Sequence, residues 1–118
     1  MRKAIAAIGI VLVGALPTLS SAGEPIETKV TIGADTVGNI YGTVKAALDD
    51  CADGRKVVVK RKRPGKDEKV GSDTTEKDSG KFRWSGNFDA GDGRFYAKAP
   101  HIGPCKTGTS KVIRVDQL

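Results

Sequence analysis

The sequence predicts an all-β protein: a single antiparallel β-sandwich of about seven strands, held by one disulfide. The prediction depends on stretches in which apolar and polar residues alternate, on turn residues between them, and on the choice of aliphatic residues. Beyond residue 22 the chain contains nine valines and five isoleucines but only two leucines. Branching at the β-carbon suits the pleated surface of a strand and restricts side-chain rotamers in a helix, so the composition favours strands.

Seven stretches alternate with a period of two and are expected to be strands. In the stretch over 56–62, Val57 and Val59 share one face and three lysines share the other. In the stretch over 81–85, Trp84 shares one face of the strand with Phe82. It is expected in the core, with stacking on a ligand as the less favoured alternative. The expected strands cover residues 26–33, 38–46, 56–62, 68–74, 81–85, 95–99 and 110–116.

Glycine, proline, asparagine and aspartate separate these stretches. Asp78-Ser79-Gly80 and Pro64-Gly65-Lys66-Asp67 are typical turn sequences, since glycine, asparagine and aspartate tolerate positive φ and proline fixes the entry to a turn. Short strands with turns at fairly regular spacing favour a sandwich. A small closed barrel stays open as the alternative, because the alternation does not say how a sheet closes.

The amino terminus has the layout of a secretory signal. Arg2 and Lys3 precede an uncharged stretch over 4–16, Pro17 interrupts it, and Ser20-Ser21-Ala22 provides small residues for cleavage after Ala22. The stretch is shorter than the roughly 20 apolar residues of a membrane span. We therefore expect a cleavable signal over 1–22, a domain over 23–118 with no membrane span, and secretion outside the bacterial cell. Removal of the signal lowers the net charge from +6 to +4.

Cys51 and Cys105 are the two cysteines of the chain, and both lie in the exported part. An even number of cysteines in an oxidising compartment predicts a bridge. By the chain-entropy relation, closing the loop between Cys51 and Cys105 raises the free energy of unfolding by roughly 4 kcal/mol. The bridge would support a domain in which only about a third of the residues are apolar. No Cys-x-x-Cys pair favours a metal or redox site instead.

Several short motifs follow one another along the chain: Ile40-Tyr41-Gly42-Thr43-Val44, 51–59, 75–82, Gly93-Arg94-Phe95-Tyr96-Ala97, Cys105 and 110–115. Their order resembles the carboxypeptidase regulatory-like, or transthyretin-like, group of extracellular bacterial β-sandwiches. The resemblance implies the fold, and it implies an accessory rather than a catalytic module. Gly42 in a strand interior would leave room for a bulky neighbour such as Trp84. The cysteine pair and a longer turn depart from the group.

No motif in the chain indicates catalysis. His101 is the only histidine, no Gly-x-Ser-x-Gly sequence accompanies it, and the paired carboxylates lie in turns beside lysine or arginine. We expect no catalytic residues, cofactor or metal. The acidic turns at 49–54 and 87–93 leave a weak calcium site open, although neither has the spacing of a twelve-residue calcium loop.

The basic run over 56–66 is the strongest candidate for contact with a partner. Because side chains alternate along a strand, Lys60 and Lys62 should share the outer face, with Arg61 and Arg63 on the other. The candidate polyanion-binding residues are Lys56, Lys60, Lys62 and Arg63. The favoured alternative is an edge strand whose lysines prevent sheet-to-sheet aggregation, with nearby acidic residues neutralising the charge.

Three functions follow from these features, in decreasing order of support. The first is a secreted, non-enzymatic structural or interaction module whose partner and oligomeric state the sequence does not identify. The second is a binder of an anionic cell-envelope polymer or a carbohydrate through the basic strand. The third is an enzyme or an enzyme inhibitor, for which the loop over 100–108 is the one candidate.

Overall fold

The computed structural model describes residues 25–35, 38–88 and 91–116, so the expected signal over 1–22 lies outside the described residues. The described part contains ten strands and one short 3-10 helix, η2 (Asp49–Cys51). The strands are β3 (Thr28–Val30), β4 (Gly33–Ala34), β5 (Asn39–Ala46), β6 (Lys56–Arg61), β7 (Glu68–Thr74), β8 (Glu76–Asp78), β9 (Lys81–Asn87), β10 (Gly93–Ala99), β11 (Gly108–Thr109) and β12 (Ile113–Val115).

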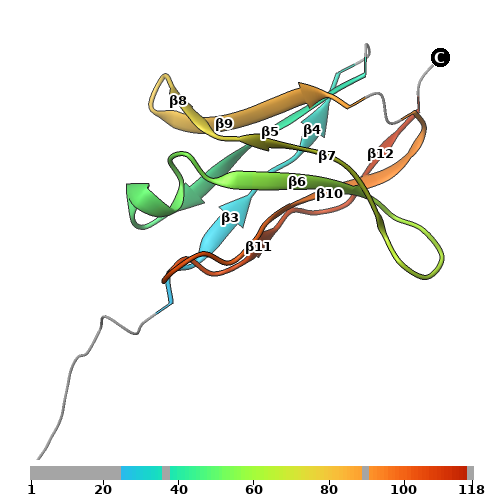
Figure 1. Cartoon of the computed structure of the whole chain (residues 1–118). Coiled ribbons are helices and arrows are strands. Elements are labelled where there is room, and N and C mark those ends of the chain that lie inside the picture. The colour runs from blue at the N-terminus through green and yellow to red at the C-terminus, as the bar shows by residue number, and fades with distance from the viewer. Residues whose placement is uncertain (1–24, 36–37, 89–90, 117–118) are drawn as a thin grey trace, which may run out of the picture.

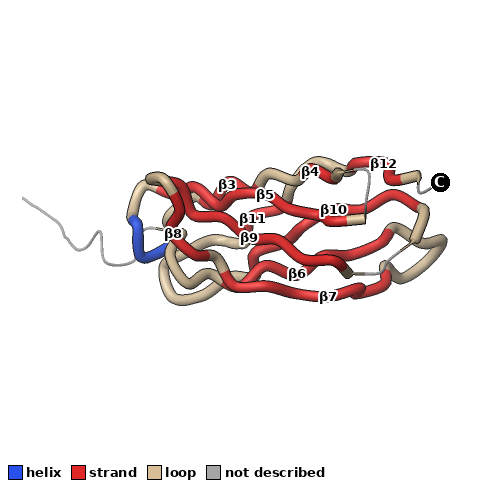
Figure 2. The backbone as a smooth tube through the Cα atoms, turned by 90° about the horizontal axis from the view of Figure 1, so that it is seen from above, coloured by secondary structure: helices blue, strands red, loops and turns tan. Residues whose placement is uncertain are grey.

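Two antiparallel sheets pack face to face (Figure 1). One has the order β7, β6, β10, with β11 and β12 both pairing with the far side of β10. The other has the order β8, β9, β5, with β3 and β4 both pairing with β5. Figure 2 shows the short helix at one end of this body. The expected sandwich is therefore confirmed, and the alternative of a closed barrel is wrong.

The core lies between the two sheets and is formed by the faces that alternation marks as apolar. Val57 and Val59 of β6 and Phe95 of β10 are fully buried and pack in one cluster with Ile40 and Trp84 of the opposite sheet. Each large side chain removed from water contributes roughly 1.5–3 kcal/mol. Trp84 is 1% exposed, so the prediction that it is a core residue is confirmed.

In the second sheet, Gly42 allows the Thr31 backbone and the Trp84 side chain to approach β5 unusually closely. It pairs with Trp84, and a Cβ at this position would lie 2.7 Å from Trp84 Cζ2 and would collide with the backbone carbonyl of Thr31. The Thr43 N–H donates to the Thr31 hydroxyl at 2.9 Å rather than to a backbone carbonyl. The expected continuous strand over 26–33 is consequently interrupted at 31–32 and appears as β3 and β4.

Other boundaries differ from the expectations in a few places. β8 and β11 were not predicted, and the last strand is shorter than the expected 110–116. The turn expected at 78–80 does form, as the hairpin between β8 and β9. Ser79 and Gly80 both have positive φ, at 53° and 81°, as a two-residue hairpin turn requires.

The disulfide joins Cys51, the last residue of η2, to Cys105 before β11, with a Cα–Cα distance of 5.5 Å, so the predicted bridge is confirmed. Beside it lies Arg55, which is 3% exposed and which sequence reasoning did not single out. Its guanidinium donates to the Thr28 hydroxyl and to four backbone carbonyls, and burial lowers its pKa. The acceptor carbonyls belong to Cys51, Ala99, Pro100 and Lys106.

Candidate basic face

The lysines of β6 lie on the outer face of the first sheet. Val57 and Val59 point into the core, which places Lys56 and Lys60 on the opposite side of the strand. The neighbouring strand follows the same rule, because buried Phe95 and Ala97 alternate with Tyr96 and Lys98. The strand register then sets Tyr96 beside Lys60 and Lys98 beside Val58.

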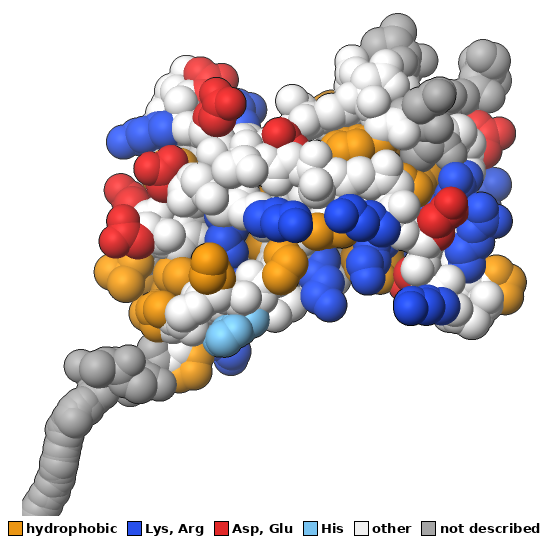
Figure 3. Space-filling model, viewed as in Figure 1, with side chains coloured by type: hydrophobic (Ala, Val, Ile, Leu, Met, Phe, Trp, Pro, Cys, Tyr) orange, Lys and Arg blue, Asp and Glu red, His pale blue; other side chains and the backbone are white. Residues whose placement is uncertain are grey.

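Further cations join this surface through pairing that the sequence does not reveal. β7 sets Lys69 beside Lys60, and β12 sets Arg114 beside Arg94. Lys62 N–H donates to the Arg94 carbonyl at 2.8 Å, which continues the pairing past the end of β6. Figure 3 shows lysine and arginine side chains gathered over β6 and β10. We call this surface the basic face; its cations are Lys56, Lys60, Lys62, Lys69, Arg94, Lys98 and Arg114.

Few acidic groups oppose these charges. Lys62 Nζ lies 3.8 Å from Asp67 Oδ2, and Arg114 Nε lies 3.1 Å from Asp116 Oδ1. Within the described ranges the other five cations of the basic face form no ion pair. The face therefore carries an excess of positive charge, although residues 23–118 as a whole are only moderately basic.

Asp67 is tied to the basic face by Tyr96. The Tyr96 hydroxyl donates to Asp67 Oδ2 at 2.6 Å, and the Arg63 backbone N–H donates to the other oxygen at 3.2 Å. These two hydrogen bonds hold the pKa of Asp67 below its ordinary range. The same bond to the carboxylate, together with burial, raises the pKa of Tyr96 to about 12. Tyr96 is thus a fixed neutral donor under physiological conditions.

A shallow hollow of about 330 Å³ lies on the basic face beside Tyr96. Lys62 Nζ is 5.8 Å from the centroid of the Tyr96 ring, so an ammonium group stands over the aromatic face. The hollow is open to solvent and combines cations, hydroxyls and one ring. Its lining residues are Lys62, Tyr96, Lys98, Thr109, Ser110 and Val112.

The structure brings together three of the four predicted residues, Lys56, Lys60 and Lys62, but not Arg63. Arg63 lies in the turn after β6, where its guanidinium pairs with Glu68 at 2.9 Å, and Glu68 also pairs with Arg61 at 3.1 Å. The expectation of an edge strand is wrong, because β6 lies between β10 and β7. Its lysines therefore do not serve to protect a sheet edge.

In the part of the chain that the structure describes, neither the loop over 100–108 nor the acidic turns bring candidate groups together into a site. His101 is exposed, and the loop is held by the disulfide and by mutual backbone hydrogen bonds between Ile102 and Cys105. In the described residues no group of three or more histidine, cysteine, aspartate or glutamate side chains is arranged to hold a metal ion. Asp89, part of one calcium candidate, lies outside those residues.

Comparison with models of known protein families gave no match, and comparison with curated proteins gave none either. In the described ranges, no helix has the length and apolar character needed to cross a membrane.

Proposed function

We propose that this protein is a non-enzymatic binding module that holds an anionic polymer of the cell envelope on its basic face. The observation that supports the proposal is the seven cations placed on one sheet surface by strand register, five of them without an ionic partner in the described ranges. The amino-terminal signal would direct the module to the cell exterior, where such polymers are found. The resemblance to transthyretin-like accessory modules supports a role without catalysis.

The shape of the basic face favours a polymer over a small anion. Its cations are spread over four strands that lie about 4.8 Å apart, so one small ligand would reach only a few of them. A chain with regularly repeated charges contacts many at once and releases its counterions on binding. The affinity should therefore fall steeply as salt rises, because exposed charges are screened beyond about 10 Å at 0.1 M salt.

Two charge-reversed variants distinguish binding at the basic face from a general effect of net charge. The test variant carries Lys60→Glu and Lys98→Glu, both on the basic face. The matched control carries Lys29→Glu and Lys45→Glu, a register pair on the outside of the other sheet. Both variants lose the same net charge, and all four lysines lie on strands whose inward neighbours are unchanged.

Elution from immobilised heparin, a sulfated polysaccharide, provides the measurement. We expect the wild-type protein to elute with rising salt, the control to elute close to it, and the test variant to elute at much lower salt. Loss of two contacts should also reduce the slope of log affinity against log salt by about 2. Equal loss of retention in both variants, or no retention of the wild-type protein, would refute the proposal.

A further inference from the structure

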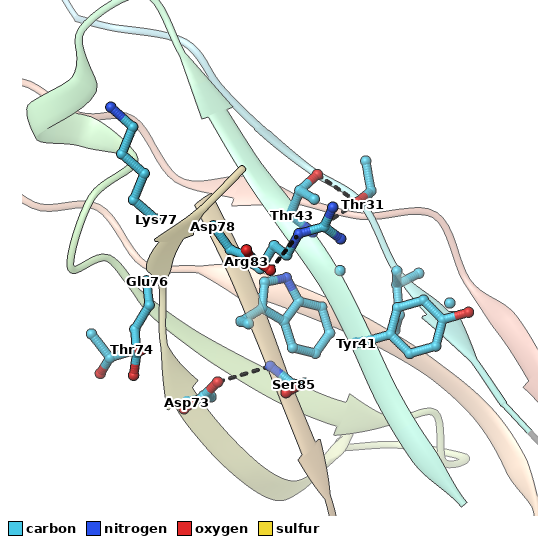
Figure 4. Close-up of a pocket in the computed structure, with 14 residues that line it drawn as sticks. Thr31, Tyr41, Thr43, Asp73, Thr74, Glu76, Lys77, Asp78, Arg83 and Ser85 are labelled. Carbon is cyan, nitrogen blue, oxygen red and sulfur yellow. Dashed lines mark hydrogen bonds and ion pairs between the residues drawn. The ribbon is translucent and has the colours of Figure 1, made fainter. Parts of the chain in front are cut away.

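The second sheet has a groove on its outer face, opposite in the fold to the basic face. Its volume is about 950 Å³. Figure 4 shows Tyr41 at one end, Lys77 and Glu76 toward the other, and Arg83 between them. The proposed polymer site does not use this groove, and the groove shares none of its lining residues with the basic face.

Strand register arranges the floor of the groove in two rows. In one row Tyr41 stands between Gly33 of β4 and Ser85 of β9. In the other, Arg83 stands between Thr43 of β5 and Glu76 of β8. The rows are two residues apart, or about 7 Å along the strands. In the first row the strand neighbours of Tyr41 on both sides are small, so neither of them covers the ring.

Tyr41 forms an aromatic platform. A Cβ on Gly33 would meet Cε1, Cζ and the phenolic oxygen of Tyr41 at 3.0, 3.2 and 3.3 Å, so one face of the ring lies against the glycine. The residue is 45% exposed, which leaves the other side of the ring accessible. Gly33 therefore lets the ring lie flat against the sheet, whereas a Cβ at this position would make the ring shift by a few tenths of an ångström.

Polar groups surround the platform in orientations set by other bonds. The hydroxyls of Thr31 and Thr43 are 2.8 Å apart, and Arg83 Nε lies 3.4 Å from Asp78 Oδ2. Asp73 lies near the end of β7, where the chain crosses to the other sheet, and its carboxylate accepts the Ser85 N–H at 2.8 Å. Each of these groups retains donors or acceptors that face the groove, because a carboxylate accepts several hydrogen bonds and a guanidinium donates five.

The charges of the groove nearly balance, unlike those of the basic face. Among its lining residues Lys77 and Arg83 are positive, and Asp73, Glu76 and Asp78 are negative. A strongly charged ligand of either sign would therefore meet repulsion on part of the lining. A flat aromatic ring beside planar, bidentate polar groups suits a ligand with one apolar face and a rim of hydroxyls.

From these features we propose that the groove binds a neutral carbohydrate, with the apolar C–H face of one sugar ring on Tyr41 and its hydroxyls on Arg83, Asp78 and the threonines. The inference goes beyond the polymer-binding function, because it uses the other sheet and a ligand without charge. A protein with both surfaces would attach to a neutral glycan and an anionic polymer at the same time.

Native gel electrophoresis in gels that contain soluble polysaccharides tests this proposal. The probes are starch, a β-glucan, a mannan and a xylan, each neutral. We expect at least one of them to retard the protein. The variant Tyr41→Ala should weaken that binding by about tenfold, as expected when an aromatic anchor of an interface is truncated. Tyr41→Phe keeps the ring and should retain most of the affinity.

Two controls keep the test specific. Leu48→Ala removes another half-exposed apolar side chain, outside the groove, and should bind as the wild-type protein does. If Tyr41→Ala lowers the temperature of unfolding, Arg83→Gln tests the same groove through an exposed side chain and should also weaken binding. Retardation by none of the four probes, or retardation that survives both Tyr41→Ala and Arg83→Gln, overturns the proposal.

The polymer-binding proposal is tested separately. The variant with Lys60→Glu and Lys98→Glu should be retarded by the neutral polysaccharide as strongly as the wild-type protein. Conversely, Tyr41→Ala should keep its retention on heparin. A protein that binds heparin but no neutral polysaccharide would refute the groove alone, and the opposite result would refute the basic face alone.

Discussion

The outer faces of the two sheets both result from the alternation of side chains along the strands, but they differ in charge and in the types of residue they carry. On β6 and β10 the outward positions are mostly lysine and arginine, with few acidic residues among them. On β5 and β9 they include Tyr41, Thr43, Arg83 and Ser85, with acidic residues of β8 alongside. Burial alone therefore determines the inward positions, and the outward positions are free to define a separate surface on each sheet.

The largest effect is expected at the disulfide, at the end where the two sheets are joined. Replacing Cys51 and Cys105 by alanine should lower the free energy of unfolding by about 4 kcal/mol, because the unfolded chain regains the entropy of the closed loop. Denaturant unfolding measures the change, and heparin and glycan binding should disappear together as the protein unfolds. An unchanged unfolding midpoint under reducing conditions would contradict this expectation.

Gly42→Ala should have the next largest effect on stability, and it should act on the sheet that carries the groove. The new Cβ would collide with the Thr31 carbonyl and with Trp84, so the strands must separate. Overpacking of this kind costs about 3 kcal/mol. Thermal unfolding checks the value, with Ser85→Ala, an exposed change on the outer face of the same sheet, expected to remain within about 0.5 kcal/mol of wild type. Equal effects of the two substitutions would show that Gly42 is not required.

Acid should weaken the turn beside the basic face. Tyr96 lowers the pKa of Asp67, and Arg63 lowers that of Glu68. A carboxylate with a lowered pKa adds stability that is present above its unfolded pKa and is lost as pH falls through its folded pKa. We expect stability to decrease below about pH 4.5. Unfolding curves from pH 6 to pH 2 test this, and in Asp67→Asn the decrease should be smaller.

The smallest effect concerns Asp67 itself, which is the acidic group paired with Lys62 on the basic face. Asp67→Asn removes the carboxylate whose hydrogen bond and charge help to raise the pKa of Tyr96 to about 12, so that pKa should fall toward the ordinary value of about 10. Ultraviolet titration of the tyrosines measures the change. The same variant should elute from heparin at slightly higher salt. A Tyr96 pKa that does not move would show that the hydrogen bond to Asp67 is not its cause.

Local pattern predicted much of the fold. Alternation identified the buried faces of β6, β9 and β10, and turn residues identified the hairpin at Ser79 and Gly80. The predicted contact between Gly42 and Trp84 is confirmed. These features depend on residues within one strand or one turn, or on the need of a large side chain for space. The division of 26–33 into β3 and β4 could not be predicted, because it results from a side-chain hydrogen bond across strands.

The candidate sites were less accessible from the sequence. The basic run drew attention to β6, but an interior strand and an edge strand have the same alternation, so its place in the sheet was predicted wrongly. Arg63 was assigned to the basic surface because its partner, Glu68, is on the return strand. Tyr41 was recognised only as part of a motif, since nothing local shows that Gly33 lies beneath its ring.

The sequence by itself determined the class of fold, the disulfide and which side of each strand is buried, because these follow from side-chain chemistry at short range. Only the tertiary structure decided which outward side chains are neighbours. Strand order and register are set by the packing of the whole core. They bring lysines from β6, β7 and β10 onto one face and place Tyr41, Arg83 and the carboxylates of β8 around a groove on the other.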